Sequence, residues 1–295
     1  MKNLLTLMSN PANPLLTDDI VSRYVARLDD VTGISWLSEG VAVDIYFEDD
    51  LAEAKESLRP DLSAEDFDFA FQQTDQRRKK LLVADMDSTI IQCECIDELA
   101  DFAGLKAEIS AMTEAAMQGH VDFEQTLRDR VALLKGMDEA ILQQVYAERV
   151  HLMPGAVALI KTMNAGGANT VLVSGGFTFF TSRVAAVTGF QVNRANTLDI
   201  KDGKLTGLVL PPIVDSKTKL ESLLEFQKKA KLSRHETMAV GDGANDILMI
   251  AEAGLGVAYH AKPAAEKAAD IIIAQADLTA LLYLQGYSDQ DFVTE

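Results

Sequence analysis

From residue 81 onward, short apolar runs alternate with segments that have helical spacing. The runs that indicate buried strands lie at 81–84, 170–173, 237–240, 256–258 and 271–274. Strands that alternate with helices in this way form parallel sheets with right-handed crossovers. The pattern therefore predicts an α/β fold around a mainly parallel sheet. Residues 192–200 and 204–210 flank Asp202 and Gly203, a turn signal that predicts a hairpin.

Residues 1–71 show a separate pattern in the order β-α-β-β-α-β. Its strands are expected at 4–8, 34–37, 41–48 and 67–71. The first helix begins at Thr17, a good N-cap, and the second spans 51–58 and ends before Pro60. This order of elements predicts a ferredoxin-like α+β module.

Residues 96–151 have helical spacing almost throughout and interrupt the pattern directly after the first strand of the sheet. We expect them to form a helical cap inserted into an α/β core of residues 81–95 and 152–295. Residues 72–80 contain no apolar residue, which indicates a linker. The basic run within this linker favours a solvated connection over a partner-binding patch.

The chain has 295 residues, of which 48% are apolar and 24% charged, and its net charge is −18. A surface this acidic repels phosphate backbones, which argues against a nucleic-acid partner. No apolar run approaches the ~20 residues that span a bilayer, and the first residues lack the features of a signal peptide. Cys93 and Cys95 are too few for a disulfide framework and indicate packing thiols. We expect a soluble cytoplasmic protein without a membrane partner.

Polar motifs follow three of the expected strands. Residues 85–89 read DMDST, residues 174–176 read SGG and residues 241–246 read GDGAND, while Lys219 lies near a helix start. Parallel strands present their carboxyl ends at one edge of a sheet, where α/β folds bind ligands. We therefore expect these segments to converge. Asp85 and Asp87 share a face only if the chain stays extended there, because side chains alternate along a strand.

A phosphate monoester fits this set of residues if cations offset the clustered carboxylates. Mg²⁺ prefers hard oxygen ligands, and Asp85, Asp242 and a backbone carbonyl supply them. Lys219 adds a positive charge and Ser174 a hydroxyl donor, while Gly175 permits close approach of backbone N–H groups. Positioning and charge neutralisation are most of what phosphoryl transfer needs.

Asp85 could attack phosphorus to form an aspartyl-phosphate, with Asp87 transferring protons. These ordered motifs, with a helical insertion directly after the first, resemble those of the haloacid dehalogenase superfamily of phosphatases. Longer matching segments are DMDSTIIQCECIDELA (85–100), AAMQGHVDFEQTLRDRVALLKG (115–136), VSGGFTFF (173–180) and GDGANDILMI (241–250). The resemblance covers roughly residues 80–295. It implies Mg²⁺-dependent hydrolysis of O-phosphoserine to serine and phosphate, the last step of serine biosynthesis.

Matched residue by residue, the resemblance implies that Asp85 is the nucleophile and Asp87 the acid/base. It places the side chains of Asp85 and Asp242 at the Mg²⁺. The main-chain carbonyl of Asp87 completes the protein ligands in this family, and Asp246 supports the metal.

The resemblance also implies contacts to the substrate from both core and cap. Glu94 falls where the family binds the substrate ammonium. Arg130 falls where it binds the carboxylate, which a guanidinium grips with two hydrogen bonds. Phosphate contacts fall at Ser174, Gly175, Lys219 and Asn245, and apolar cap contacts at Met117 and Phe123. Lys217 is a second candidate for the phosphate lysine, although Lys219 fits the motif spacing better.

Two other functions stay open at this point. A phosphotransferase would pass the phosphoryl group from Asp85 to another alcohol. A non-catalytic amino-acid sensor is disfavoured, since it has no need of Asp85, Asp87 and Lys219 together. Residues 1–71 are similar in topology to amino-acid-sensing, ACT-like regulatory modules, which raises serine sensing as a hypothesis. The expected partner is a small-molecule substrate, and a homodimer is left open.

Overall fold

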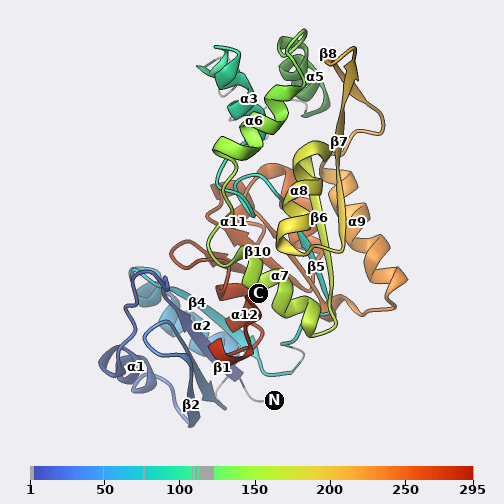
Figure 1. The fold of residues 1–295 in the computed structure, drawn as a ribbon. Helices are drawn as coiled ribbons and strands as arrows, with labels where there is room; N and C mark the ends of the chain where they lie inside the picture. The colour runs from blue at the N-terminus through green and yellow to red at the C-terminus, as the bar shows by residue number, and fades with distance from the viewer. Residues whose placement is uncertain are drawn as a thin grey trace.

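The computed structural model describes residues 3–48, 50–75, 77–107, 109, 112 and 123–294. Its larger sheet has seven strands in the order β11-β10-β9-β5-β6-β7-β8 (Figure 1). Neighbouring strands run parallel except β8, which is antiparallel to β7. The strands are β5 (Leu81–Ala84), β6 (Asn169–Phe177), β7 (Val192–Lys201), β8 (Lys204–Leu210), β9 (Thr237–Gly241), β10 (Leu255–Tyr259) and β11 (Ile271–Ile273). The α/β fold expected from the sequence is confirmed.

Alternate residues of the central strands face two separate hydrophobic cores. Leu82 and Ala84 face the core that α7, α8 and α12 cover, whereas Leu81 and Val83 face α9 and α10. Because both faces are covered, the central strands are wholly buried and their sequences are continuous apolar runs. The helices of this part are α7 (Ala156–Ala165), α8 (Thr178–Thr188), α9 (Ser216–Lys229), α10 (Ile247–Glu252), α11 (Pro263–Glu266) and α12 (Ala280–Tyr283). None of the described helices is both long and apolar enough to cross a membrane.

The inserted segment contributes the helices α3 (Cys95–Phe102), α5 (Phe123–Leu133) and α6 (Ala140–Arg149). They lie at the end of the molecule where the β7–β8 hairpin also projects (Figure 1). The β7–β8 hairpin is hydrogen-bonded to the segment that links α5 to α6. The N–H of Gly136 donates to the carbonyl of Leu205 at 2.8 Å, and that of Glu139 to Gly203 at 2.9 Å. The hairpin, which the turn signal predicted, therefore forms a second wall of the cap.

The N-terminal module has a four-stranded antiparallel sheet in the order β2-β3-β1-β4, with two helices. Its elements are β1 (Asn3–Met8), α1 (Asp18–Val25), β2 (Val31–Ser38), β3 (Ala42–Phe47), α2 (Leu51–Leu62) and β4 (Asp68–Gln73). The order β-α-β-β-α-β agrees with the expectation, and the Thr17 hydroxyl caps α1 by accepting from the N–H of Ile20. The expected end of the second helix before Pro60 is wrong. Leu58 and Leu62, one turn apart, are both fully buried in the module core and hold the last turn around the exposed Pro60.

The basic run after β4 is not a solvated connection, and that expectation is also wrong. Arg77 lies between the two parts of the chain: it pairs with Asp44 of β3 at 2.8 Å and donates to the carbonyls of Tyr283 and Leu284. These carbonyls belong to the C-terminal end of α12, which carries partial negative charge. The guanidinium of Arg78 stacks 3.2 Å from the ring centroid of Tyr287, and Lys79 and Lys80 also have partners in the core. The junction is therefore built from paired charges, of which Asp44 and Lys79 are buried and Arg78 and Lys80 are exposed.

Candidate active site

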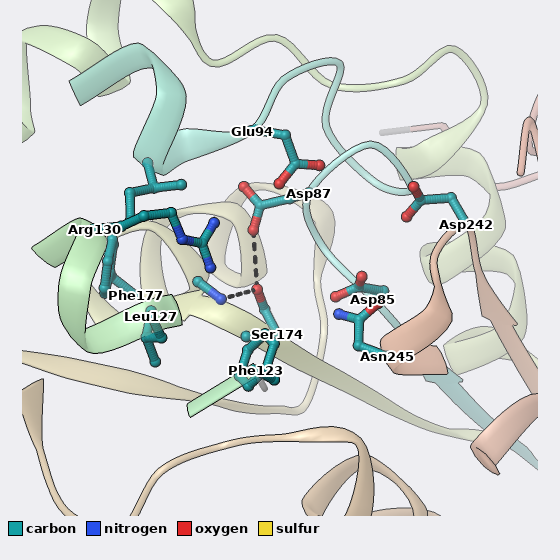
Figure 2. Close-up of a pocket in the computed structure, with 13 residues that line it drawn as sticks. Asp85, Asp87, Glu94, Phe123, Leu127, Arg130, Ser174, Phe177, Asp242 and Asn245 are labelled. Carbon is teal, nitrogen blue, oxygen red and sulfur yellow. Dashed lines mark hydrogen bonds between the residues drawn. The ribbon is translucent and has the colours of Figure 1, made fainter. Parts of the chain in front are cut away.

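The polar groups at the carboxyl ends of β5, β6 and β9 meet at one edge of the larger sheet, next to side chains of α5 (Figure 2). They enclose a cavity of about 60 Å³, room for about four to six water-sized groups. The described residues that line it are Asp85, Asp87, Glu94, Ile96, Phe123, Leu127, Arg130, Ser174, Gly175, Gly176, Phe177, Asp242 and Asn245. The convergence expected from the sequence is thus seen in the structure.

The floor of the site is a cluster of three carboxylates around one ammonium group. Lys219, in the first turn of α9, is fully buried, and its Nζ lies 2.8 Å from Asp85 Oδ1 and 2.6 Å from Asp246 Oδ1. The other oxygen of Asp246 accepts the N–H groups of Asp242 and Gly243 at 3.2 and 3.1 Å. Lys217 is exposed. The structure therefore places Lys219, and not Lys217, in the cluster.

The charges in this cluster do not balance. Burial, together with Asp246, raises the pKa of Asp85 to about 8, and the same two causes raise the pKa of Asp242. Burial opposes the charged form of Lys219, but Asp246 and Asp85 more than offset it and raise its pKa. Carboxylate oxygens of Asp85, Asp242 and Asp246 lie within 4.8 Å of one another. Clustered hard oxygen donors with excess negative charge fit a divalent cation.

Asp87 is held by hydrogen bonds to both of its carboxylate oxygens. Its Oδ1 accepts the N–H of Cys95 at 2.8 Å, and its Oδ2 accepts the hydroxyl of Ser174 at 3.0 Å (Figure 2). A Cβ added at Gly176 would lie 2.6 Å from Asp87 Oδ2, so only glycine fits there. Burial raises the pKa of Asp87, against the opposing effect of the Cys95 hydrogen bond. A carboxyl group with a raised pKa is suited to donate and recover a proton.

Opposite charges, one just before α3 and one on α5, line the same cavity. Glu94 precedes α3, and its Oε1 accepts the hydroxyl of Ser88 at 2.7 Å. Burial and the nearby Asp87 raise the pKa of Glu94 to about 8. Arg130 of α5 is only 5% exposed, and burial lowers its pKa although Glu94 acts against this. An acid and a guanidinium in one small cavity provide partners for both charges of an amino acid.

The remaining expected residues fall around the same cavity where the structure describes them. Phe123 closes over Gly175, where an added Cβ would lie 2.8 Å from the ring atom Cζ. Asn245 lines the cavity beside Asp85 (Figure 2). Met117 lies outside the described residues.

Two supporting residues were missed by the sequence reasoning. Thr89 donates its hydroxyl to Asp242 Oδ1 at 3.2 Å, and it belongs to the DMDST motif, which could have indicated it. Asn196 of β7 is fully buried, donates to the carbonyl of Gly175 at 2.7 Å and accepts the N–H of Val214. Nothing in the sequence around Asn196 signals this role, because the hydrogen bonds join segments that meet only in the fold.

Comparison with known proteins agrees with this site. The family profile of the haloacid dehalogenase-like hydrolases matches residues 82–251, which shows that the chain belongs to that family. The chain is 49% identical to the phosphoserine phosphatase of Haemophilus influenzae over 210 residues, covering 71% of this chain and 67% of the relative.

Solved structures extend the similarity. A probable phosphoserine phosphatase from Vibrio cholerae, in unliganded form, has a TM-score of 0.78 at 37% identity and covers 98% of this chain and 88% of its own. This alignment therefore includes the N-terminal module. A structure described as a phospho-aspartyl intermediate analogue of phosphoserine phosphatase has a TM-score of 0.67 at 39% identity, covering 70% of this chain and 98% of its own.

Proposed function

We propose that this protein is a phosphoserine phosphatase, which hydrolyses O-phospho-L-serine to L-serine and phosphate in the last step of serine biosynthesis. The observation that carries the proposal is the joining of two sets of groups in one cavity. Asp85, which lines the cavity and pairs with the buried Lys219, suits a phosphate, and the opposite charges of Glu94 and Arg130 line the same cavity. The similarity to the phosphatases named above supports the same substrate.

The positions of Asp85 and Asp87 support a two-step reaction. The Asp85 carboxylate attacks phosphorus, and the P–O bond to serine breaks as Asp87 protonates the leaving alkoxide. Asp87 then accepts a proton from water, the water oxygen attacks phosphorus, and inorganic phosphate leaves as the Asp85 carboxylate is restored. The hydrogen bonds to Cys95 and Ser174 keep Asp87 oriented in both steps.

We infer that the cation of this site is Mg²⁺. Its ligands would be the side chains of Asp85 and Asp242 and the main-chain carbonyl of Asp87. The oxygens of Asp246 already accept hydrogen bonds from Lys219 and two N–H groups. Asp246 would therefore support the metal site by holding these groups in place. When bound, Mg²⁺ neutralises charge on the phosphate and on the clustered carboxylates.

Recognition of the substrate is assigned to residues of both the core and the cap. Glu94 would pair with the ammonium group of phosphoserine and Arg130 with its carboxylate, while Ser174, Gly175, Lys219 and Asn245 would hold the phosphate. Phe123 covers the site on its cap side, where its ring lies over Gly175.

Phosphate release from a panel of esters tests this function. We expect the purified chain to hydrolyse phosphoserine much faster than phosphothreonine or sugar phosphates, to lose activity in EDTA and to recover it with added Mg²⁺. Equal rates across the panel would contradict the proposed substrate, and full activity in EDTA would contradict the metal.

We also propose that the enzyme acts in the cytoplasm. Both cysteines, Cys93 and Cys95, are free thiols, as is usual in a reducing compartment. A homodimer is compatible with this proposal, and light scattering of the purified chain measures it directly.

A further inference from the structure

One contact between the N-terminal module and the core concerns a buried carboxylate. Asp68, the first residue of β4, is 6% exposed. Its oxygens accept the N–H groups of Ala274, Gln275 and Ala276 at 2.9, 3.0 and 2.8 Å. A carboxylate that accepts several backbone N–H groups holds their segment strongly, since hydrogen bonds to a charged acceptor exceed neutral ones. The module thereby fixes the loop that follows β11.

The same loop contacts His260, the residue that follows β10. The N–H of His260 donates to the carbonyl of Ile273 at 2.8 Å, and its ring Nε2 lies 3.1 Å from the carbonyl oxygen of Ala276. The φ angle of His260 is +44°, a left-handed conformation that few residues other than glycine adopt. Such a backbone persists only where its surroundings hold it. The loop at 274–276 is therefore part of what keeps His260 in place.

Two residues further along, the chain reaches the proposed metal site. The N–H of Lys262 donates to the main-chain carbonyl of Asp242 at 2.8 Å. The N–H of Asp242, on the other side of the residue, donates to Asp246. The backbone of Asp242 is thus anchored on both sides, once from within its own motif and once from the segment that starts at His260.

We propose that Asp68 is a positioning residue for the cation site, and that the N-terminal module acts on metal affinity through it. The connection runs from Asp68 through the loop at 274–276 and His260 to Lys262, and from there to Asp242. Loss of the Asp68 contact loosens the segment that donates one of the two backbone hydrogen bonds to Asp242. The Asp242 carboxylate then occupies the cation-binding position less often. The inference rests on the metal site of the proposed function, and it concerns cation binding rather than the chemical steps.

Asp68→Asn tests the inference in the 295-residue chain. The variant keeps the size of the side chain but places an NH₂ donor against backbone N–H groups. We expect its dissociation constant for Mg²⁺, measured by titration calorimetry without substrate, to rise about three- to tenfold, as coupling over such a network produces. At saturating Mg²⁺, kcat for phosphoserine should stay within about twofold of the original.

Asp66→Asn is the matched control, because Asp66 lies two residues away in the same segment and is exposed. It should leave Mg²⁺ binding unchanged. A purely structural role of Asp68 would lower the unfolding temperature of the metal-free protein and leave the Mg²⁺ dissociation constant as it was, and that result would overturn the inference.

His260→Asn keeps the test decisive if Asp68→Asn folds poorly. Asparagine tolerates a left-handed backbone but is too short to reach the Ala276 carbonyl. It should weaken Mg²⁺ binding in the same direction, and the two substitutions together should cost less than the sum of their separate effects. Normal Mg²⁺ binding by His260→Asn would overturn the inference while phosphoserine hydrolysis stands. A wild-type chain that binds no Mg²⁺ and hydrolyses no phosphoserine would overturn the proposed function together with the inference.

Discussion

At the scale of single residues, the site holds more negative charge than the chain itself neutralises. Asp85 and Asp246 share the ammonium group of Lys219, Asp242 lies beside them, and burial with mutual repulsion raises the pKa of Asp85 and Asp242. This repulsion opposes folding of the metal-free protein and favours cation binding. Removing one carboxylate should therefore harm function far more than stability.

Asp85→Asn is expected to abolish phosphate release and to leave the fold intact. The amide cannot act as the nucleophile, while its neutrality relieves the crowding around Asp242 and Asp246. The unfolding temperature of the metal-free protein, measured in EDTA, should stay within about 4 °C of the original, the shift that ~1 kcal/mol gives in a protein of this size. Asp202→Asn, in the exposed hairpin turn, is the control that should change neither quantity. Normal turnover by Asp85→Asn would remove Asp85 from the mechanism.

Arg130→Ala is expected to act only on substrates that carry a carboxylate. The loss in kcat/KM for phosphoserine should be about 30-fold to several thousand-fold, since removing one partner of a buried charge pair costs about 2–5 kcal/mol. The kcat/KM for phosphoethanolamine, which has the phosphate and ammonium but no carboxylate, should change little.

Glu94→Gln provides the matched test of the opposite charge. Glu94→Gln should weaken the binding of both phosphoserine and phosphoethanolamine, because both carry the ammonium group. If Arg130→Ala lowered kcat/KM equally for phosphoserine and phosphoethanolamine, Arg130 would not be the partner of the substrate carboxylate.

At the scale of elements, the sequence predicts those parts whose pattern is set locally. β5, β9 and β10 were found because strands covered on both faces must be continuously apolar. The end of α2 was not found, because burial of Leu62 in the module outweighs the local effect of Pro60. The packing of the β7–β8 hairpin on the cap has no local signal either, since its partners are far away in the chain.

Gly207→Ala tests whether this hairpin supports substrate binding. Gly207 has a φ of +82°, and an added Cβ would lie 2.9 Å from the Cβ of Lys135, just after the helix that carries Arg130. The substitution should displace the hairpin from α5 and raise KM for phosphoserine several-fold. Gly203→Ala is the control, because Gly203 has a φ of +73° but nothing within 4 Å of an added Cβ. Both variants pay about 1–2 kcal/mol of backbone strain, so an equal KM in the two would mean that the hairpin plays no part in binding.

At the scale of the whole molecule, the N-terminal module and the core form one packed unit. Met8, Ala42 and Ala70 of the module belong to the same hydrophobic core as Leu281 of α12. The sequence suggested a solvated linker because a run of charged residues looks the same whether it is exposed or paired. The partners of Arg77 lie 33 and more than 200 residues away, so only the fold reveals them. Unfolding of the module alone would expose part of the core of its neighbour.

Arg77→Met is therefore expected to destabilise the entire protein. It leaves the carboxylate of Asp44 fully buried without its cation, which costs about 3–5 kcal/mol, and urea unfolding should show a single transition at lower concentration. Adding Asp44→Asn should recover much of the lost free energy of unfolding, because the buried, unpaired carboxylate is then replaced by a neutral amide. Lys80→Met is the control: its pair with Glu236 is exposed, and such pairs contribute about 0–1 kcal/mol. If Arg77→Met instead splits unfolding into two transitions, with the core unchanged, then the module folds independently and the shared core does not couple the two parts.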